Sequence, residues 1–178
     1  MAMAFPTARV RRWVPPMPGA ELGITSNEVF HLDKQPSKIV ITGGGYIAAE
    51  FAGILQGLGC RTTMLVRSAL LRDFDEDIVD GLATALRQNG VDLRVGAVVR
   101  EVELATGGYR AHYVDEGGDS AVEAETCVFF ATGRAPNTAG LGLEEGLMEL
   151  WARHLFETVR SDVRMVLSPP RFTLFPGG

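Results

Sequence analysis

The sequence predicts an α/β fold in which helices flank a parallel sheet and an antiparallel β-meander follows. Between residues 38 and 95, short runs of β-branched and other apolar residues alternate with segments of helical periodicity. Such alternation is typical of parallel strands that are joined by helices. Between residues 98 and 123, polar-faced strand segments are separated by glycine pairs, as in a chain of hairpins.

The expected helices and strands can be placed by residue number. An acidic start at Asp75–Asp77, which a helix N-terminus favours, opens one helix, and Asn89-Gly90 ends it. A capping box at Thr25–Glu28 opens a further short helix that runs through Leu32. The expected order is helix 25–32, strand 38–42, helix 46–58, strand 61–66, helix 75–88, strand 91–95, meander strands 98–104, 109–114 and 121–123, and strand 127–131.

The composition is that of a globular protein. The 178 residues are 46% hydrophobic and 22% charged, which is enough apolar material for one buried core and argues against disorder. The net charge of −5 gives no basis for nucleic-acid binding by bulk charge. No apolar run approaches the roughly 20 residues of a membrane span, so no membrane partner is expected.

The cysteines and histidines form no redox or metal-binding motif. Cys60 and Cys127 lie far apart beside expected strands, which predicts buried thiols, no disulfide framework and a cytoplasmic location. The three histidines, His31, His112 and His154, do not have the spacing of metal ligands, so no metal site is expected.

The segment after strand 38–42 has the pattern G-x-G-x-x-A, formed by Gly43, Gly45 and Ala48. A strand precedes it, a helix follows and the next strand comes at residue 61, which is the context that this pattern requires. Gly43 permits a tight turn, Gly45 lets a pyrophosphate approach the backbone, and Ala48 allows close packing of helix on strand. The helix N-terminus then offers free N–H groups to the phosphates. These features predict a Rossmann-like NAD(P)-binding domain.

The loop after strand 61–66 favours NADP(H) over NAD(H). An NAD site usually ends this strand in Asp or Glu, which binds the ribose 2′-hydroxyl. Here the strand ends in Val66-Arg67, and Arg72 lies in the same loop before Asp73. Either arginine can pair with a 2′-phosphate. The alternative is that both are solvated loop residues.

Three segments together resemble the NADPH-binding domain of the glutathione reductases, which are flavin-dependent pyridine nucleotide–disulfide oxidoreductases. The segments are Gly43–Ile54 (GGGYIAAEFAGI), the loop that begins at Arg67 and runs through Arg72-Asp73-Phe74-Asp75, and Ala131–Asn137 (ATGRAPN). The resemblance extends over roughly residues 16–146. It implies a Rossmann-like fold, an NADPH cofactor and oxidoreductase chemistry.

The resemblance implies roles for the glycine turn and the helix that follows it. Tyr46 resembles the mobile tyrosine that covers the nicotinamide pocket, and Glu50 resembles the carboxylate near the nicotinamide carboxamide. These two are the candidate catalytic residues. A structural role for Glu50 is the alternative, because a carboxylate in the first helical turn also suits the helix dipole. The residues implied to hold the pyrophosphate are Gly43, Gly45 and Ala48, and Ile47 is a further candidate cofactor-binding residue.

The resemblance also implies roles for two later loops. Arg67 resembles the first ligand of the 2′-phosphate and Arg72 the second, while Gly133 and Arg134 resemble the loop that lines the cofactor cleft. The loop between the arginines is one residue shorter than the family's usual spacing, and Ser68 stands where another basic residue can occur. These departures leave the position of Arg72 open and would lower the selectivity for NADP.

Several parts of such an enzyme are missing from the sequence. It has no second G-x-G-x-x-G for FAD before residue 43 and no C-x-x-x-x-C redox disulfide. We expect a segment 1–36 that leads from a missing FAD domain, an NADPH-binding domain at 37–146, and an atypical tail at 147–178. The family is expected to form a homodimer, but the interface domain is absent here.

The resemblance implies the chemistry of an NADPH-dependent glutathione-disulfide reductase, which contributes to redox homeostasis. In that chemistry electrons pass from NADPH to FAD, then to a redox disulfide and then to glutathione disulfide. We expect this chain to be a truncated fragment that carries the NADPH-binding domain and is inactive alone. The alternatives are a stand-alone, non-catalytic NADPH-binding module or remnant, and a related disulfide oxidoreductase with another substrate.

Overall fold

The computed structural model describes residues 10–136 of the chain. One compact unit comprises Arg12–Ala135, and residues 1–11 and 136–178 are assigned to a second unit. The expected tail at 147–178 lies outside the described residues, as does the end of the predicted NADPH-binding domain at residue 146. The division of the chain at residues 36 and 146 therefore stays a prediction.

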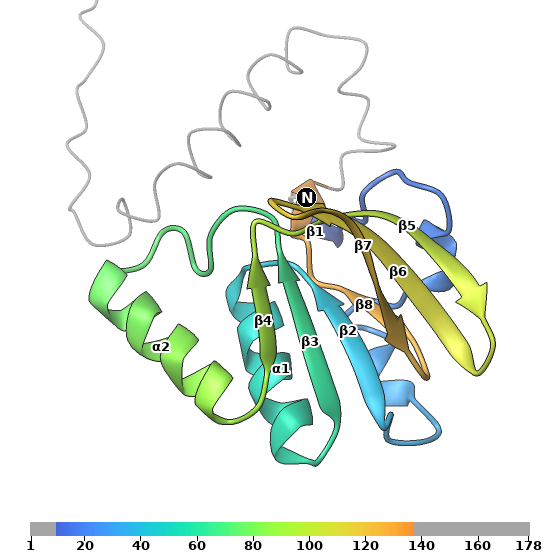
Figure 1. Cartoon of the computed structure of the whole chain (residues 1–178), viewed down its shortest axis with the longest axis horizontal. Helices are drawn as coiled ribbons and strands as arrows, with labels where there is room; N and C mark the ends of the chain where they lie inside the picture. The colour runs from blue at the N-terminus through green and yellow to red at the C-terminus, as the bar shows by residue number, and fades with distance from the viewer. Residues whose placement is uncertain (1–9, 137–178) are drawn as a thin grey trace, which may run out of the picture. The chain divides into compact units, whose positions relative to one another are not determined.

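A four-stranded parallel sheet lies at the centre of the compact unit (Figure 1). In spatial order its strands are β4 (Asp92–Val95), β3 (Arg61–Val66), β2 (Lys38–Thr42) and β8 (Val128–Phe130). The inner strand β2 is apolar on both faces, and Ile39, Val40 and Ile41 are all fully buried. The predicted parallel α/β arrangement is confirmed.

Two helices cover one face of this sheet (Figure 1). Helix α1 (Tyr46–Gly57) lies between β2 and β3 in the chain, and α2 (Glu76–Gln88) lies between β3 and β4. Their buried residues Ala48, Ala52 and Leu86 pack with the alternate strand residues that point to this side, which include Ile39 and Ile41. Small alanines on the buried side of α1 allow the helix to lie close to the strands.

An antiparallel meander covers the opposite face of the sheet. Its strands are β5 (Val98–Ala105), β6 (Gly108–Asp115) and β7 (Gly118–Ala124), paired in chain order. Alternate residues of the parallel strands point to this opposite face and pack with the meander residues Val102 and Ala111. They include Val40, Leu65 and Phe130. The predicted meander is confirmed, and its second and third strands start one and three residues earlier than expected because the glycines Gly108 and Gly118 already pair.

The predicted helix at residues 25–32 is wrong in extent. The chain forms only one single turn of 3-10 helix here, η2 (Val29–His31), and another, η1 (Ala20–Leu22), precedes the predicted range. Half of the capping box is present, because the Thr25 backbone N–H donates to the Glu28 carboxylate at 2.8 Å. So short a segment cannot repay the cost of nucleating an α-helix in isolation. The remaining short strands, β1 (Val10–Arg12) and β9 (Arg134–Pro136), lie at the ends of the described range.

One polar network joins the edge of the parallel sheet to the meander. The guanidinium of Arg94 on β4 donates to the Asp92 carboxylate at 2.9 Å and to the hydroxyl of Tyr113 on β6. The same guanidinium lies over the Tyr113 ring, 5.5 Å from its centroid. The hydrogen bonds that Arg94 donates to the Asp92 carboxylate raise the pKa of Arg94 further above its usual range. Arg94 therefore stays charged and links two layers that no backbone pairing connects at this point.

Replacing Phe129 with Ala should lower the free energy of unfolding by about 3–5 kcal/mol. Phe129 is fully buried, and its ring packs edge-on against Phe51 with 5.1 Å between centroids. The matched control is Phe30→Ala: Phe30 also meets Phe51, at 5.4 Å, but it is 76% exposed, so the loss should stay below about 1 kcal/mol. Urea denaturation followed by circular dichroism measures both, and equal losses would contradict the central position of Phe129.

Candidate dinucleotide-binding site

The candidate site lies along the edge of the sheet where the parallel strands end, called here the carboxyl edge. The loops after β2, β3 and β8 all begin at this edge because these strands are parallel and in register. The chain proceeds outward from β2 to β3 and β4, and it returns to the other side of β2 with β8. In open α/β sheets a ligand binds outside the carboxyl ends of strands at such a reversal of strand order.

Nearby backbone atoms leave no room for a side chain at the first two glycines of the turn after β2. Gly43 has a φ of 135°, and a Cβ atom on it would lie 2.2 Å from the carbonyl oxygen of Ala131. Its N–H donates to the Leu65 carbonyl oxygen at 2.9 Å, which links the turn to β3. A Cβ on Gly44 would lie 2.5 Å from the carbonyl oxygen of Ala69. No other residue type fits at these positions without movement of the backbone.

Gly45 differs from both of its neighbours. Its φ of −84° and ψ of 176° are open to any residue, and a Cβ on it would meet no atom within 4 Å. The residue is exposed. Neither backbone conformation nor packing explains a glycine here, whereas the approach of a ligand to the backbone does.

The N-terminus of α1 is open to an anion, and that of α2 is not. Gly45 caps α1 without any side-chain hydrogen bond, and the first turn of α1 has no acidic residue. In α2, by contrast, the Asp75 carboxylate accepts from the N–H groups of Asp77 and Ile78, and Glu76 and Asp77 add negative charge. The unpaired N–H groups and the positive dipole end of α1 therefore remain available to a phosphate.

The residues that follow Gly45 divide between solvent and core. Tyr46 is 54% exposed and Glu50 is exposed, so both side chains are accessible from solvent. Ala48 is fully buried against the sheet, so it can offer a ligand only backbone groups, whereas Ile47 is partly buried and packs against the same core. Glu50 is the fifth residue of α1 and lies in its second turn, which corrects the expected position in the first turn.

The arginine loop after β3 is attached directly to the glycine turn. The Leu71 N–H donates to the Gly44 carbonyl oxygen at 2.7 Å, and the side chains of Leu70 and Leu71 are buried in the core. Arg67 and Arg72 are both exposed at either end of this buried pair. The structure therefore brings the two predicted arginines to the same edge as the glycine turn.

The loop after β8 completes the edge. The Ala131 N–H donates to the Thr42 carbonyl oxygen at 2.8 Å, so this loop begins beside the glycine turn. Gly133 has a φ of 123° and is exposed, and Arg134 follows it. Trp13, which the sequence analysis missed, holds this loop: its N–H donates to the Gly133 carbonyl at 3.0 Å, and its carbonyl accepts from the Thr132 hydroxyl at 2.6 Å. No local pattern around Trp13 could have indicated contacts so distant in sequence.

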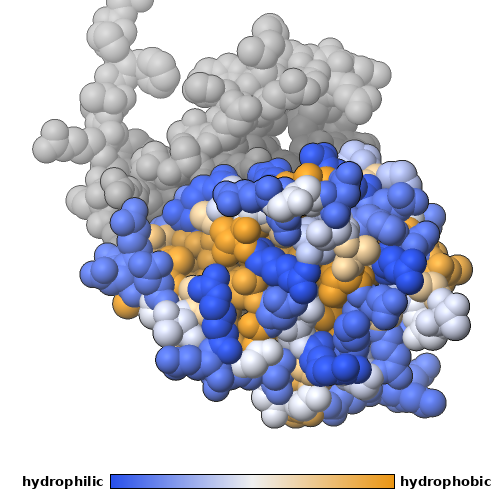
Figure 2. Space-filling model, viewed as in Figure 1, coloured by the Kyte–Doolittle hydropathy of each residue, from blue (hydrophilic) through white to orange (hydrophobic). Residues whose placement is uncertain are grey.

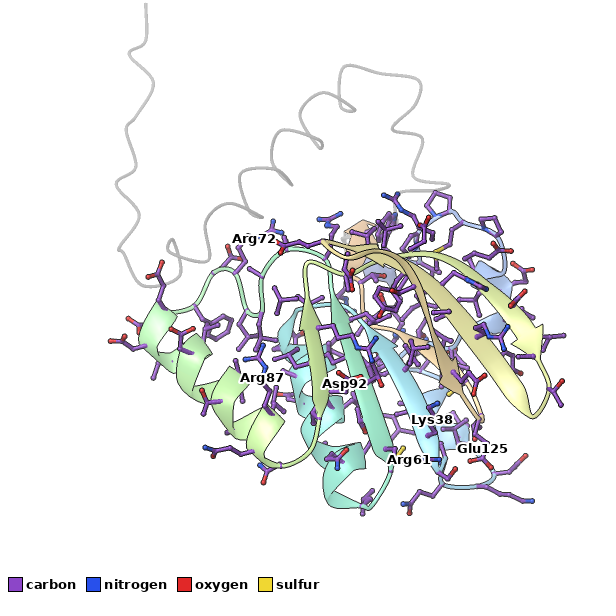
Figure 3. All side chains as sticks on the ribbon, viewed as in Figure 1. Lys38, Arg61, Arg72, Arg87, Asp92 and Glu125 are labelled. Carbon is purple, nitrogen blue, oxygen red and sulfur yellow. The ribbon has the colours of Figure 1, made fainter. Side chains whose placement is uncertain are left out.

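A separate hollow of about 270 Å³ lies at the opposite end of the sheet. Lys38, Arg61 and Glu125 line it, and Figure 3 shows them at the edge opposite to Arg72. The Ser37 hydroxyl donates to the Glu125 carboxylate, and the Lys38 ammonium lies 3.9 Å from the Glu123 carboxylate, so both carboxylates of the hollow already have partners. The hollow holds none of the residues predicted to bind a cofactor.

The two cysteines are structural. Cys60 and Cys127 are both free thiols buried in the core on the helix side of the sheet. Burial raises the pKa of Cys60 and raises the pKa of Cys127 to about 12. Both thiols are therefore neutral at physiological pH and unreactive. The predicted buried thiols are confirmed.

Within residues 10–136, no group of three or more His, Cys, Asp or Glu side chains could hold a metal ion. No helix in the same part of the chain is long and apolar enough to span a membrane.

Comparison with known proteins agrees with this geometry. A family model described as pyridine nucleotide-disulphide oxidoreductase matches residues 8–158. The fold is of the type found in flavoprotein disulfide reductases. The chain belongs to the pyridine nucleotide-disulphide oxidoreductase family.

Curated relatives include glutathione reductases from two bacteria. The one from Burkholderia cepacia is 48% identical over 132 residues, and the one from Nostoc sp. is 42% identical over 131 residues. These matches cover 74% and 73% of this chain but only 28% of each relative. The chain therefore spans between a quarter and a third of the length of these relatives.

Among solved structures, the HOCl-induced flavoprotein disulfide reductase RclA from Escherichia coli is similar at a TM-score of 0.66 and 32% identity. The match covers 77% of this chain and 31% of that protein. The similarity confirms the predicted Rossmann-like α/β fold and the predicted resemblance to flavin-dependent disulfide oxidoreductases.

In the native protein, Cys60 and Cys127 should resist iodoacetamide at pH 8, because both thiols are buried and their pKa values are raised. Both should become alkylated once the chain is unfolded in urea, which serves as the positive control. Intact-mass spectrometry counts the added groups. Rapid modification of either thiol in the folded protein would contradict its placement in the core.

Proposed function

We propose that this chain is the NADPH-binding domain of a glutathione-reductase-like flavoprotein disulfide reductase, with NADPH bound along the carboxyl edge. The observation that carries the proposal is the contrast within the glycine turn. Gly43 and Gly44 have protein atoms against them, whereas the space beside Gly45 is open. A dinucleotide pyrophosphate would approach the backbone through that space and meet the uncapped N-terminus of α1.

Each predicted site residue then has a role at this edge. Arg67 and Arg72 would pair with the 2′-phosphate, and Tyr46 and Glu50 would face the nicotinamide end. When bound, NADPH supplies a hydride, and these residues bind and orient it. The groups assigned to the pyrophosphate and to the far wall of the cleft are the backbone of Gly43, Gly45, Ile47 and Ala48, and the loop residues Gly133 and Arg134.

The surface of α1 supports membership in a larger protein. Ile54 of α1 and Leu58, which caps the end of the helix, are large apolar side chains that are 54% and 59% exposed, and the exposed Gly53 and Gly57 leave them uncovered. Neighbouring large apolar side chains that are left exposed on a helix are typical of a surface that another part of a protein covers. Hydrophilic residues form most of the face drawn in Figure 2, as expected of a surface in contact with water. We infer that further polypeptide, which would carry the FAD site and the homodimer interface, covers the outward side of α1.

The chain alone would bind NADPH without reducing a disulfide. The only cysteines of the sequence are Cys60 and Cys127, which are buried and lie apart in the chain. They cannot act as a redox pair that exchanges electrons with an external substrate. A stand-alone NADPH-binding module in the cytoplasm is the second candidate, and it would use the same edge.

Replacing Gly45 with Ala should reduce NADPH affinity at least tenfold, because a methyl group would enter the space proposed for the pyrophosphate. The fold should be retained, and the free energy of unfolding should change by no more than about 1 kcal/mol, because alanine can adopt the φ and ψ of Gly45 without strain. Quenching of tryptophan fluorescence by NADPH measures the affinity, and thermal denaturation measures the stability.

Gly57→Ala is the matched control, because Gly57 lies in the same helix and a Cβ on it would also meet no atom within 4 Å. This variant should keep the wild-type affinity for NADPH. If Gly45→Ala binds NADPH as tightly as the wild type, the proposed path of the pyrophosphate is incorrect.

A further inference from the structure

The loop between β3 and α2 has two buried leucines in its middle and exposed polar side chains on either side of them. Leu70 and Leu71 are only 4% and 8% exposed, while Arg67, Ser68 and Arg72 are exposed. Leu71 has a φ of 42°, and it is the only residue other than glycine with a positive φ within residues 10–136. A leucine in this conformation is held by its surroundings, here by burial and by its hydrogen bond to Gly44.

The side chains of Ser68 and Arg72, which lie on either side of the two leucines, form a hydrogen bond. The Arg72 Nη2 atom donates to the Ser68 Oγ atom at 2.6 Å. Within the described residues neither Arg67 nor Arg72 forms an ion pair, although the carboxylates of Asp73 and Asp75 are close in sequence. Among the described residues, the Ser68 hydroxyl is therefore the side-chain partner of the Arg72 guanidinium.

The contact leaves most of the hydrogen-bonding capacity of both groups unused. A guanidinium has five N–H donors, and this bond uses one of them. The Ser68 hydroxyl acts here as an acceptor, so its own hydrogen can still be donated. Together with Arg67, the pair offers one hydroxyl and two guanidinium groups, which is the donor set that a phosphate dianion binds well.

We propose that Ser68 is a specificity-determining residue that positions Arg72 for the 2′-phosphate of NADPH and donates its hydroxyl hydrogen to that phosphate. The inference rests on the proposed function of the same edge. Ser68 stands where another basic residue can occur in this loop. It would contribute to phosphate binding by holding Arg72 in position. Because the side chain is ordered before the ligand arrives, less rotamer entropy is lost on binding.

The test compares wild-type protein with Ser68→Ala and Ser68→Thr in calorimetric titrations against NADPH, NADH and 2′,5′-ADP. Ser68→Ala should lower the affinity for NADPH and for 2′,5′-ADP about three- to tenfold and should change the affinity for NADH by less than about twofold. Ser68→Thr keeps the hydroxyl and should restore binding to within about twofold. Since Ser68 is exposed, the melting temperature should be the same for all three proteins. Ser120→Ala, in β7, is the control for loss of a serine elsewhere.

Two results would overturn the inference for different reasons. If Ser68→Ala weakens NADPH and NADH equally, or weakens neither, Ser68 does not determine specificity while the proposed function still stands. If the wild-type protein binds neither NADPH nor 2′,5′-ADP, the proposed function fails and the role of Ser68 fails with it.

Discussion

Strand β2 is enclosed on every side, and the rest of the domain is arranged around it. β3 and β8 pair with its two edges, while the helices and the meander cover its two faces. Ile39, Val40 and Ile41 are completely buried as a result. Since both edges of this strand are paired and both of its faces are covered, its end is fixed in position, and the turn that follows begins from a rigid support.

The chemistry of the site follows from that rigid end. Gly43 fits between the carbonyl oxygen of Ala131 and that of Leu65, so the turn cannot shift without disturbing both neighbouring strands. Gly44 then receives the N–H of Leu71, which connects the arginine loop to the turn. Residues that recognise opposite ends of a dinucleotide would therefore be held at constant separation by backbone contacts.

Much of this arrangement could be predicted from sequence because it is local. The strands 38–42 and 61–66, the start of α1 at Tyr46 and the cap of α2 at Asp75 all follow from apolar periodicity and turn chemistry. Other features depend on contacts between distant segments. Trp13 holds the loop at Gly133, and Leu71 adopts its unusual φ because of Gly44; neither has a local signal. The helix expected after Thr25 is only a single 3-10 turn, because a capping box alone does not supply the packing that keeps a helix folded.

The division of roles among the three glycines is the central claim. Two of them serve the fold, and the third leaves room for a cofactor that the family uses in redox chemistry. The most direct measurement is a titration of the purified wild-type chain with NADPH and with NADH, accompanied by an absorbance spectrum for bound flavin. The account predicts saturable binding, tighter for NADPH than for NADH, with no bound flavin and no reduction of glutathione disulfide. Failure to bind either nucleotide, or stoichiometric flavin with turnover of glutathione disulfide by this chain alone, would contradict it.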